Sequence, residues 1–176
     1  TGAEGQPRTD YRKAGLLDVQ LTTHAVSRNG AVMGTLVFVR DATAISGALV
    51  QFIISFHARH GRIPQVLLCA PTGKAAARMN EAWQRQKPVL LRALPQALQA
   101  ALPEAALTLH RLLAVEPISR QGRYRLDRTL AVDLLVFDEA SMLDLPMAVQ
   151  LFDALPASCH VLLIGDPEQL PSIEIG

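Results

Sequence analysis

The chain contains four short segments of mostly apolar residues that do not alternate regularly with polar ones. They span residues 34–39, 65–70, 134–137 and 160–164. Unbroken apolar runs of this length are typical of strands that are buried on both faces, as in a parallel sheet. We therefore predict four buried strands at these positions.

Helical patterns separate the predicted strands. Ser46 is expected to cap a helix that runs to about Arg59, and Gly61 is expected to end it. Residues 75–86 and 145–154 predict two further helices. A second helical region, rich in alanine, leucine and glutamine, is expected to be broken up by three prolines: Pro88, Pro95 and Pro103.

Strands that alternate with helices predict an α/β fold, with a mostly parallel sheet and helices on both faces. We place this domain in residues 32–176 and regard residues 1–31 as a poorly patterned N-terminal segment. The chain has 176 residues, of which 49% are hydrophobic and 19% charged. That size and composition suit one folded domain and exclude a disordered protein.

Composition also suggests the setting of the protein. Cys69 and Cys159 each lie inside an apolar run, so we expect buried free thiols, which suit a reducing compartment. No apolar run approaches the roughly 18 residues of a membrane span, and the polar N-terminus does not resemble a signal peptide. We therefore expect a cytoplasmic protein without membrane contact.

Charge is distributed unevenly along the chain. Residues 63–129 carry ten Lys or Arg against four Asp or Glu, whereas residues 130–176 carry eight acids and no Lys or Arg. A basic middle favours contact with a polyanion, and an acidic end favours a metal ion. Segregated charge is also common on solvated surfaces that have no such function.

Polar residues follow three of the predicted strands. The run 134–137 ends in Asp138 and Glu139, while the other two lead into turns at residues 71–74 and 165–172. Ligands of open α/β sheets bind at the carboxyl ends of the strands. Two adjacent acids there favour magnesium with a nucleotide phosphate, because one can hold the metal's water shell and the other can orient the attacking water. Considered alone, the pair fits a solvated Asp-Glu turn equally well.

Four motifs occur in order along the chain. They are Ala70–Met79 (APTGKAAARM), Thr108–Leu113 (TLHRLL), Val136–Asp144 (VFDEASMLD) and Gly165–Glu174 (GDPEQLPSIE). Together they resemble the motifs of superfamily 1 DNA helicases, and most of all those of the alpha-subunit (RecD) family of bacterial exonuclease V. The resemblance covers roughly residues 64–176. It implies a RecA-like P-loop motor domain that uses Mg²⁺ and ATP, moves on single-stranded DNA, and has other subunits of an exonuclease V-like complex as partners.

The resemblance also implies roles for the matching residues. Asp138 would hold magnesium through its water shell, Glu139 would activate the water that attacks the γ-phosphate, and Gln169 would sense that phosphate. Gly165 and Asp166 would shape the turn that links hydrolysis to DNA movement. Single-stranded DNA would contact two segments through the following residues: Pro71, Thr72, Gly73, Lys74, Thr108 and His110.

The first DNA segment also makes physical sense. A turn before a helix exposes backbone N–H groups and the positive end of the helix dipole to a phosphate, and Lys74 adds a charge. Arg78 lies one helical turn further on and would extend that contact. An ordinary solvated helix face would explain both cations as well. Trp83 could stack on a base, but its spacing with Ala76 and Met79 favours packing in the core.

Other candidates have plainer explanations too. Thr108 could simply cap a short helix, which is compatible with DNA contact. His110 could be a half-buried packing residue, and Gln169 could bond the backbone of its own turn.

A nucleotide motor needs one further element, the phosphate loop Gly-x-x-x-x-Gly-Lys-Ser/Thr, ahead of the Ala70 motif. The sequence does not contain it. At the only Gly-Lys pair, Gly73-Lys74, Leu68 replaces the first glycine and Ala75 the final hydroxyl residue. The expected position, residues 40–47, reads RDATAISG and has no lysine.

We therefore interpret the chain as part of an ATP-dependent DNA helicase motor that by itself hydrolyses ATP poorly or not at all. The alternative is a non-catalytic pseudo-ATPase that binds DNA or assembles with other subunits. Residues 1–62 show no resemblance of their own. Three origins stay open: a piece of a longer helicase with a diverged upstream region, a disabled motor kept as a DNA-binding or assembly element, or a reading-frame shift or rearrangement that produced residues 1–62.

Overall fold

The computed structural model describes residues 8–9, 22–28, 31–39, 42–115, 124 and 127–165, with side chains from residue 46 onward within those ranges. The strands are β1 (Arg8–Thr9), β2 (Thr22–Arg28), β3 (Ala31–Val39), β4 (Val66–Ala70), β5 (Ala106–Thr108), β6 (Leu134–Phe137) and β7 (His160–Ile164). The helices are α1 (Ala42–His60), α2 (Gly73–Ala93), α3 (Leu109–Leu112) and α4 (Leu145–Ala154), with 3₁₀ turns η1 (Gln96–Ala101) and η2 (Ala140–Met142).

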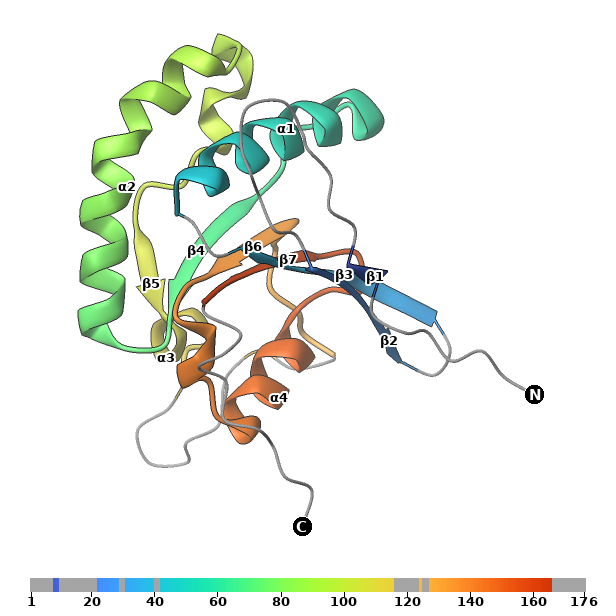
Figure 1. The fold of residues 1–176 in the computed structure, drawn as a ribbon. Coiled ribbons are helices and arrows are strands. Elements are labelled where there is room, and N and C mark those ends of the chain that lie inside the picture. Colours follow the sequence, from blue (N-terminus) through green and yellow to red (C-terminus); the bar gives the residue numbers. More distant parts are fainter. Residues whose placement is uncertain are drawn as a thin grey trace.

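A single seven-stranded sheet runs through the molecule in the order β1-β2-β3-β7-β6-β4-β5 (Figure 1). The strands from β3 to β5 in that order are all parallel to their neighbours. At the β3 side the sheet is extended by β2 and β1, which pair antiparallel. Each of the four predicted strands is present, so the prediction of a mostly parallel sheet is confirmed. β2 lies within residues 1–31, for which the sequence predicted no element.

Helices cover both faces of the sheet, as the α/β prediction requires. α1 and α2 lie on one face, and α4 lies on the other (Figure 1). Along β6 the side chains alternate between the two cores: Leu134 and Val136 pack with residues of α1 and α2, whereas Leu135 and Phe137 pack with residues of α3 and α4. All four are buried, which explains why the run contains no polar residue.

The predicted start of the first helix is wrong, and its predicted end is confirmed. α1 begins at Ala42, so Ser46 lies one turn inside the helix, where its hydroxyl donates to Oε1 of Gln86 on α2. Ala42 and Ala44 have high helix propensity and extend the helix toward β3 without a need for Ser46 as a cap. Gly61 ends the helix with a φ of 68°, and its N–H donates to the carbonyl of His57 at 2.8 Å.

The expectation that the second helix ends near residue 86 and that Pro88 breaks up the region after it is also wrong. α2 continues through this proline to Ala93. Pro88 itself is exposed, and Leu90 beyond it is buried in the same core as Trp83. Packing on both sides of the proline outweighs its local cost.

Within the described residues, no helix is both long and apolar enough to cross a membrane. Cys69 and Cys159 are both buried free thiols, as expected. Burial raises the pKa of each thiol to about 12.

An ion pair joins the strands at the amino edge of the sheet. Asp133 precedes β6 and accepts two hydrogen bonds from the Arg62 guanidinium, at 2.6 and 2.7 Å, and one from the N–H of Gln65 at 2.8 Å. The guanidinium also lies 4.8 Å from the centre of the Phe56 ring. These hydrogen bonds hold the pKa of Asp133 below its usual value, despite burial. Asp133 therefore ties α1, β4 and β6 together.

Candidate functional site

The motif residues emerge from neighbouring strands at one edge of the sheet. Ala70 at the end of β4 is in register with Thr108 of β5, and the preceding Cys69 is in register with Phe137 of β6. Phe137 in turn pairs with Leu163 of β7. The segments that follow β4, β5, β6 and β7 therefore begin side by side.

Asp138 is the first residue after β6, and it is held in place by the backbone on both sides. Its N–H donates to the carbonyl of Cys69 at 2.9 Å, and its Oδ1 accepts from the N–H of Glu139 at 2.9 Å. Burial raises the pKa of the Asp138 carboxyl, and the charge of Glu139 adds to this effect, although the hydrogen bond from the Glu139 N–H opposes it. In the described part of the chain, no Lys or Arg pairs with Asp138. The carboxylate is thus partly desolvated and has no counter-charge among the described residues.

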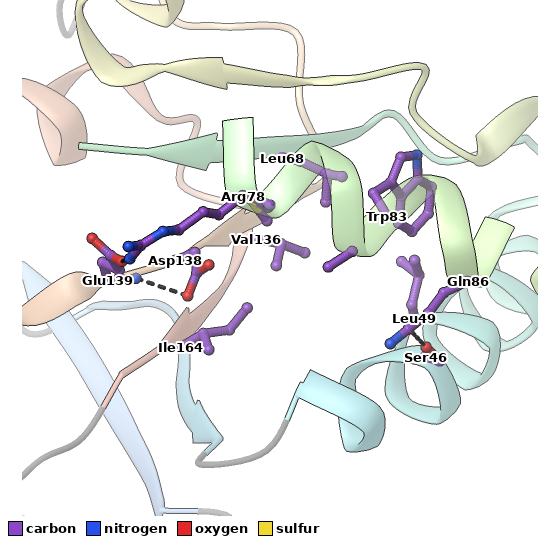
Figure 2. Close-up of a pocket in the computed structure, with 12 residues that line it drawn as sticks. Ser46, Leu49, Leu68, Arg78, Trp83, Gln86, Val136, Asp138, Glu139 and Ile164 are labelled. Atoms are coloured by element: carbon purple, nitrogen blue, oxygen red, sulfur yellow. Dashed lines mark hydrogen bonds and ion pairs between the residues drawn. The ribbon is translucent and has the colours of Figure 1, made fainter. Parts of the chain in front are cut away.

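Glu139 has a backbone conformation that is uncommon for a residue other than glycine. Its φ of 53° and ψ of 45° lie in the left-handed region, at the point where the chain turns into η2. Its side chain points toward Arg78 of α2, with 3.8 Å between Oε1 and Nη1 (Figure 2). Strained conformations of this kind are frequent at functional sites, where the surrounding structure holds them.

The end of β7 lies against the turn that follows Glu139. A Cβ atom at Gly165 would come within 3.4 Å of the N of Ala140 and 3.8 Å of the N of Ser141. Glycine at this position therefore lets the chain pass close to the η2 backbone. Asp166 and Gln169, the other two residues assigned from this motif, lie outside the described residues.

The start of α2 presents the first predicted DNA segment. Thr72 caps the helix, its Oγ1 accepting from the N–H of Ala75 at 3.2 Å, and Pro71 is half-buried. Gly73 and Lys74 are exposed, and a Cβ atom at Gly73 would meet nothing within 4 Å. The glycine thus leaves the first N–H groups of the helix accessible to an anion.

The second predicted DNA segment lies beside the first, because β5 pairs with β4. Thr108 caps α3, its Oγ1 accepting from the N–H of Arg111 at 3.3 Å. His110 is exposed, which excludes the alternative interpretation of a half-buried packing residue.

Trp83 is buried and donates from Nε1 to the carbonyl of Pro103 at 2.9 Å. Its predicted place in the core is therefore confirmed.

A cavity of about 290 Å³ lies between α1, α2 and the central strands, and reaches the two acids (Figure 2). Apolar side chains such as Leu49, Trp83 and Val136 line its inner part. At the carboxyl edge its lining includes Asp138 and Glu139, together with Arg78. The structure thus brings together three of the residues selected from the sequence; the ion pair between Arg78 and Glu139 was not foreseen.

The two acids fit a hydrated magnesium ion. Such an ion keeps several water ligands and needs only one or two carboxylates besides substrate phosphates. Asp138 offers a carboxylate that pairs with no Lys or Arg in the described ranges. A site built from protein ligands alone is not present, because no group of three or more His, Cys, Asp or Glu in the described ranges could hold a metal.

The opposite side of the site does not fit nucleotide phosphates. β3 ends at Val39 and α1 begins at Ala42, so only residues 40 and 41 connect them. A phosphate loop needs a longer glycine-rich connection whose N–H groups surround the phosphates, followed by Lys and Ser or Thr. Neither the length nor the residues of that loop are available here.

Known proteins resemble this chain over most of its length. A family model described as an AAA domain matches residues 43–174. The RecBCD enzyme subunit RecD of Haemophilus influenzae is 32% identical over 175 residues, or 98% of this chain and 26% of that protein. RecD of Mycolicibacterium smegmatis is 40% identical over 117 residues (64% and 20%). The ATP-dependent RecD2 DNA helicase of Deinococcus radiodurans is 37% identical over 113 residues (64% and 13%).

These comparisons correct one expectation and establish the family. The similarity to the H. influenzae protein covers 98% of this chain, so the expectation that residues 1–62 resemble nothing known is wrong. The chain spans about a quarter or less of the length of these relatives. It belongs to the AAA domain family, and its sequence is that of a fragment similar to RecD-like superfamily 1 helicases.

Proposed function

We propose that this chain is part of the motor of an ATP-dependent DNA helicase, and that it contacts single-stranded DNA and a hydrated magnesium ion along the carboxyl edge of its sheet. One observation carries the proposal. The exposed segments after β4 and β5 lie next to the two acids after β6, because these three strands are neighbours. The name of the D. radiodurans relative, an ATP-dependent DNA helicase, supports the same function.

The proposed DNA surface consists of the start of α2 and the β5–α3 junction. Accessible N–H groups and the positive end of the helix dipole favour a phosphate at Pro71–Lys74, and Arg78 adds a second cation one turn along. Thr108 and His110 contribute hydrogen-bonding groups on the adjacent strand. Such contacts are with the DNA backbone, so binding should weaken as salt rises and should depend little on base sequence.

The proposed metal and water site consists of the acids after β6. Asp138 would hold a magnesium ion through its water shell, and that ion would neutralise phosphate charge. Glu139 would accept a proton from a water molecule, as a carboxylate near the surface can. By resemblance, Gln169 would contact the terminal phosphate, and Gly165 and Asp166 would form the turn that responds to it.

ATP turnover by this chain alone should be very low, because residues 40–47 cannot surround the phosphates. The test is an ATPase assay with magnesium, with and without single-stranded DNA, on the wild type and Glu139→Gln. Turnover at the background level in both proteins is expected. Magnesium-dependent, DNA-stimulated turnover that is lost in Glu139→Gln would show that the missing loop is dispensable.

The connection of only two residues between β3 and α1 favours a second candidate function, a non-catalytic module that binds DNA. It predicts salt-sensitive binding of single-stranded DNA that nucleotide does not change. In either case, the double charge reversal Lys74→Glu and Arg78→Glu should weaken DNA binding at least tenfold. The matched control reverses Arg85 and Arg92 on the same helix, farther from the carboxyl edge. Equal loss in both variants would show that the assigned surface is wrong.

The setting and partners are also proposals. The two buried free thiols support a reducing, cytoplasmic location. The names of the RecD relatives, which are subunits of the RecBCD enzyme, support other subunits of such an enzyme as partners. Co-expression with those subunits, followed by size-exclusion chromatography, tests the assembly.

A further inference from the structure

One side chain links the proposed DNA surface to the proposed water-activating residue. Arg78 lies on α2, one turn beyond Lys74, and its guanidinium extends toward Glu139 after β6 (Figure 2). The Nη1–Oε1 distance is 3.8 Å. The cation that would extend the DNA contact is therefore also the cation nearest to Glu139 in the described part of the chain.

Arg78 is held only weakly in this ion pair, so it can exchange Glu139 for another anion. The Arg78 side chain is 64% exposed and that of Glu139 is 34% exposed. The pair has a single long contact, whereas Arg62 makes two hydrogen bonds of 2.6 and 2.7 Å to Asp133. A loose, exposed pair contributes little free energy, so a stronger anion can displace it.

A DNA phosphate is such an anion. A guanidinium can donate two parallel hydrogen bonds to a phosphate, which is a stronger interaction than one contact of 3.8 Å. Exposure leaves the guanidinium accessible from the same side of α2 as Lys74, which lies one turn earlier. The carboxylate and the phosphate would therefore compete for one arginine.

We propose that Arg78 is shared between Glu139 and a phosphate of single-stranded DNA, so that DNA binding withdraws the arginine from Glu139. Arg78 is then a positioning residue for Glu139 as well as a DNA contact. The inference rests on the proposed DNA surface. Because coupling between two equilibria is reciprocal, removal of the Glu139 charge must strengthen DNA binding through Arg78.

A double-mutant cycle in DNA affinity tests the coupling without nucleotide or turnover. The four proteins are the wild type, Arg78→Gln, Glu139→Gln and the double variant, titrated with a fluorescein-labelled oligo-dT at fixed salt. Glu81→Gln is the matched control, because it removes one acid from the exposed side of α2 close to Arg78. Urea denaturation of each protein verifies that it is folded.

Glu139→Gln should tighten DNA binding about two- to fivefold in the wild type and leave it unchanged in Arg78→Gln. Glu81→Gln should have a smaller effect, equal in both backgrounds. An equal gain from Glu139→Gln in both backgrounds, or no gain in the wild type, overturns the sharing of Arg78 and leaves the DNA surface intact. Absence of binding by the folded wild type overturns the DNA surface itself, and the inference with it.

Discussion

Strand β6 is flanked by an aspartate at each end, and the two carboxylates have opposite environments. Asp133, at the amino end, accepts hydrogen bonds from the Arg62 guanidinium and the Gln65 N–H, and its pKa is lowered. Asp138, at the carboxyl end, is also partly buried, but it accepts from the neighbouring Glu139 N–H and its pKa is raised.

This difference indicates that Asp133 has a structural role, whereas the carboxylate of Asp138 is available to bind a cation. The charge of Asp133 is compensated within the protein, so Asp133 stabilises the fold at neutral pH. Keeping Asp138 charged costs free energy, since no Lys or Arg among the described residues offsets its burial. A bound cation would recover that cost, which is why the magnesium proposal is placed at Asp138 and none is placed at Asp133.

The largest expected effect is on stability. Asp133→Asn should lower the free energy of unfolding by about 1–3 kcal/mol, because it removes the charge that the Arg62 guanidinium contacts and weakens the acceptor of the Gln65 N–H. Asp138→Asn should be neutral or slightly stabilising, because it removes a partly buried charge that no cation of the described residues compensates. Urea denaturation at pH 7 measures both variants. A larger loss in Asp138→Asn would mean that its carboxylate has a structural partner after all.

The second effect concerns pH. The pKa of Asp133 is lower in the folded state than in the unfolded state. Its contribution to the free energy of unfolding is therefore complete above its unfolded pKa of about 3.9, and is lost as the pH falls through its folded pKa. The difference in unfolding free energy between the wild type and Asp133→Asn should therefore be constant near neutrality and shrink in acid. For Asp138 the folded pKa is raised, so its penalty applies above that pKa and disappears on acidification.

Urea titrations at a series of pH values follow both differences. The advantage of Asp138→Asn over the wild type should fade at a higher pH than the disadvantage of Asp133→Asn. The reverse order would contradict the contrast between the two ends of β6.

The sequence was informative where a local pattern carries the signal. The run Leu134–Phe137 is buried on both faces, and the abrupt change to Asp138 and Glu139 marks its carboxyl end. The spacing of Trp83 with Met79 identified the core face of α2 for the same reason. Periodicity and strand ends are properties of a few consecutive residues, and can therefore be recognised without knowledge of the tertiary structure.

The features that were missed depend on distant residues. Asp133 lies directly before the same apolar run, but its partner Arg62 is 71 positions earlier, and nothing local distinguishes it from a solvated acid. Pro88 was expected to break a helix that Leu90 holds in the core. The contact of Arg78 with Glu139 likewise depends on the pairing of β4, which leads into α2, with β6, and this pairing joins distant parts of the sequence.

The smallest expected effect is on the urea midpoint when Arg62 or Arg78 is replaced by lysine. Arg62→Lys keeps the charge but loses the paired hydrogen bonds to Asp133, so it should lower the urea midpoint, by less than Asp133→Asn does. Arg78→Lys changes a single exposed contact of 3.8 Å and should leave the midpoint unchanged. In DNA affinity the order should reverse, since Arg78 lies on the proposed DNA surface and Arg62 lies at the amino edge. A lowered midpoint in Arg78→Lys would indicate that its pair with Glu139 stabilises the fold, and would remove the reason to regard it as exchangeable.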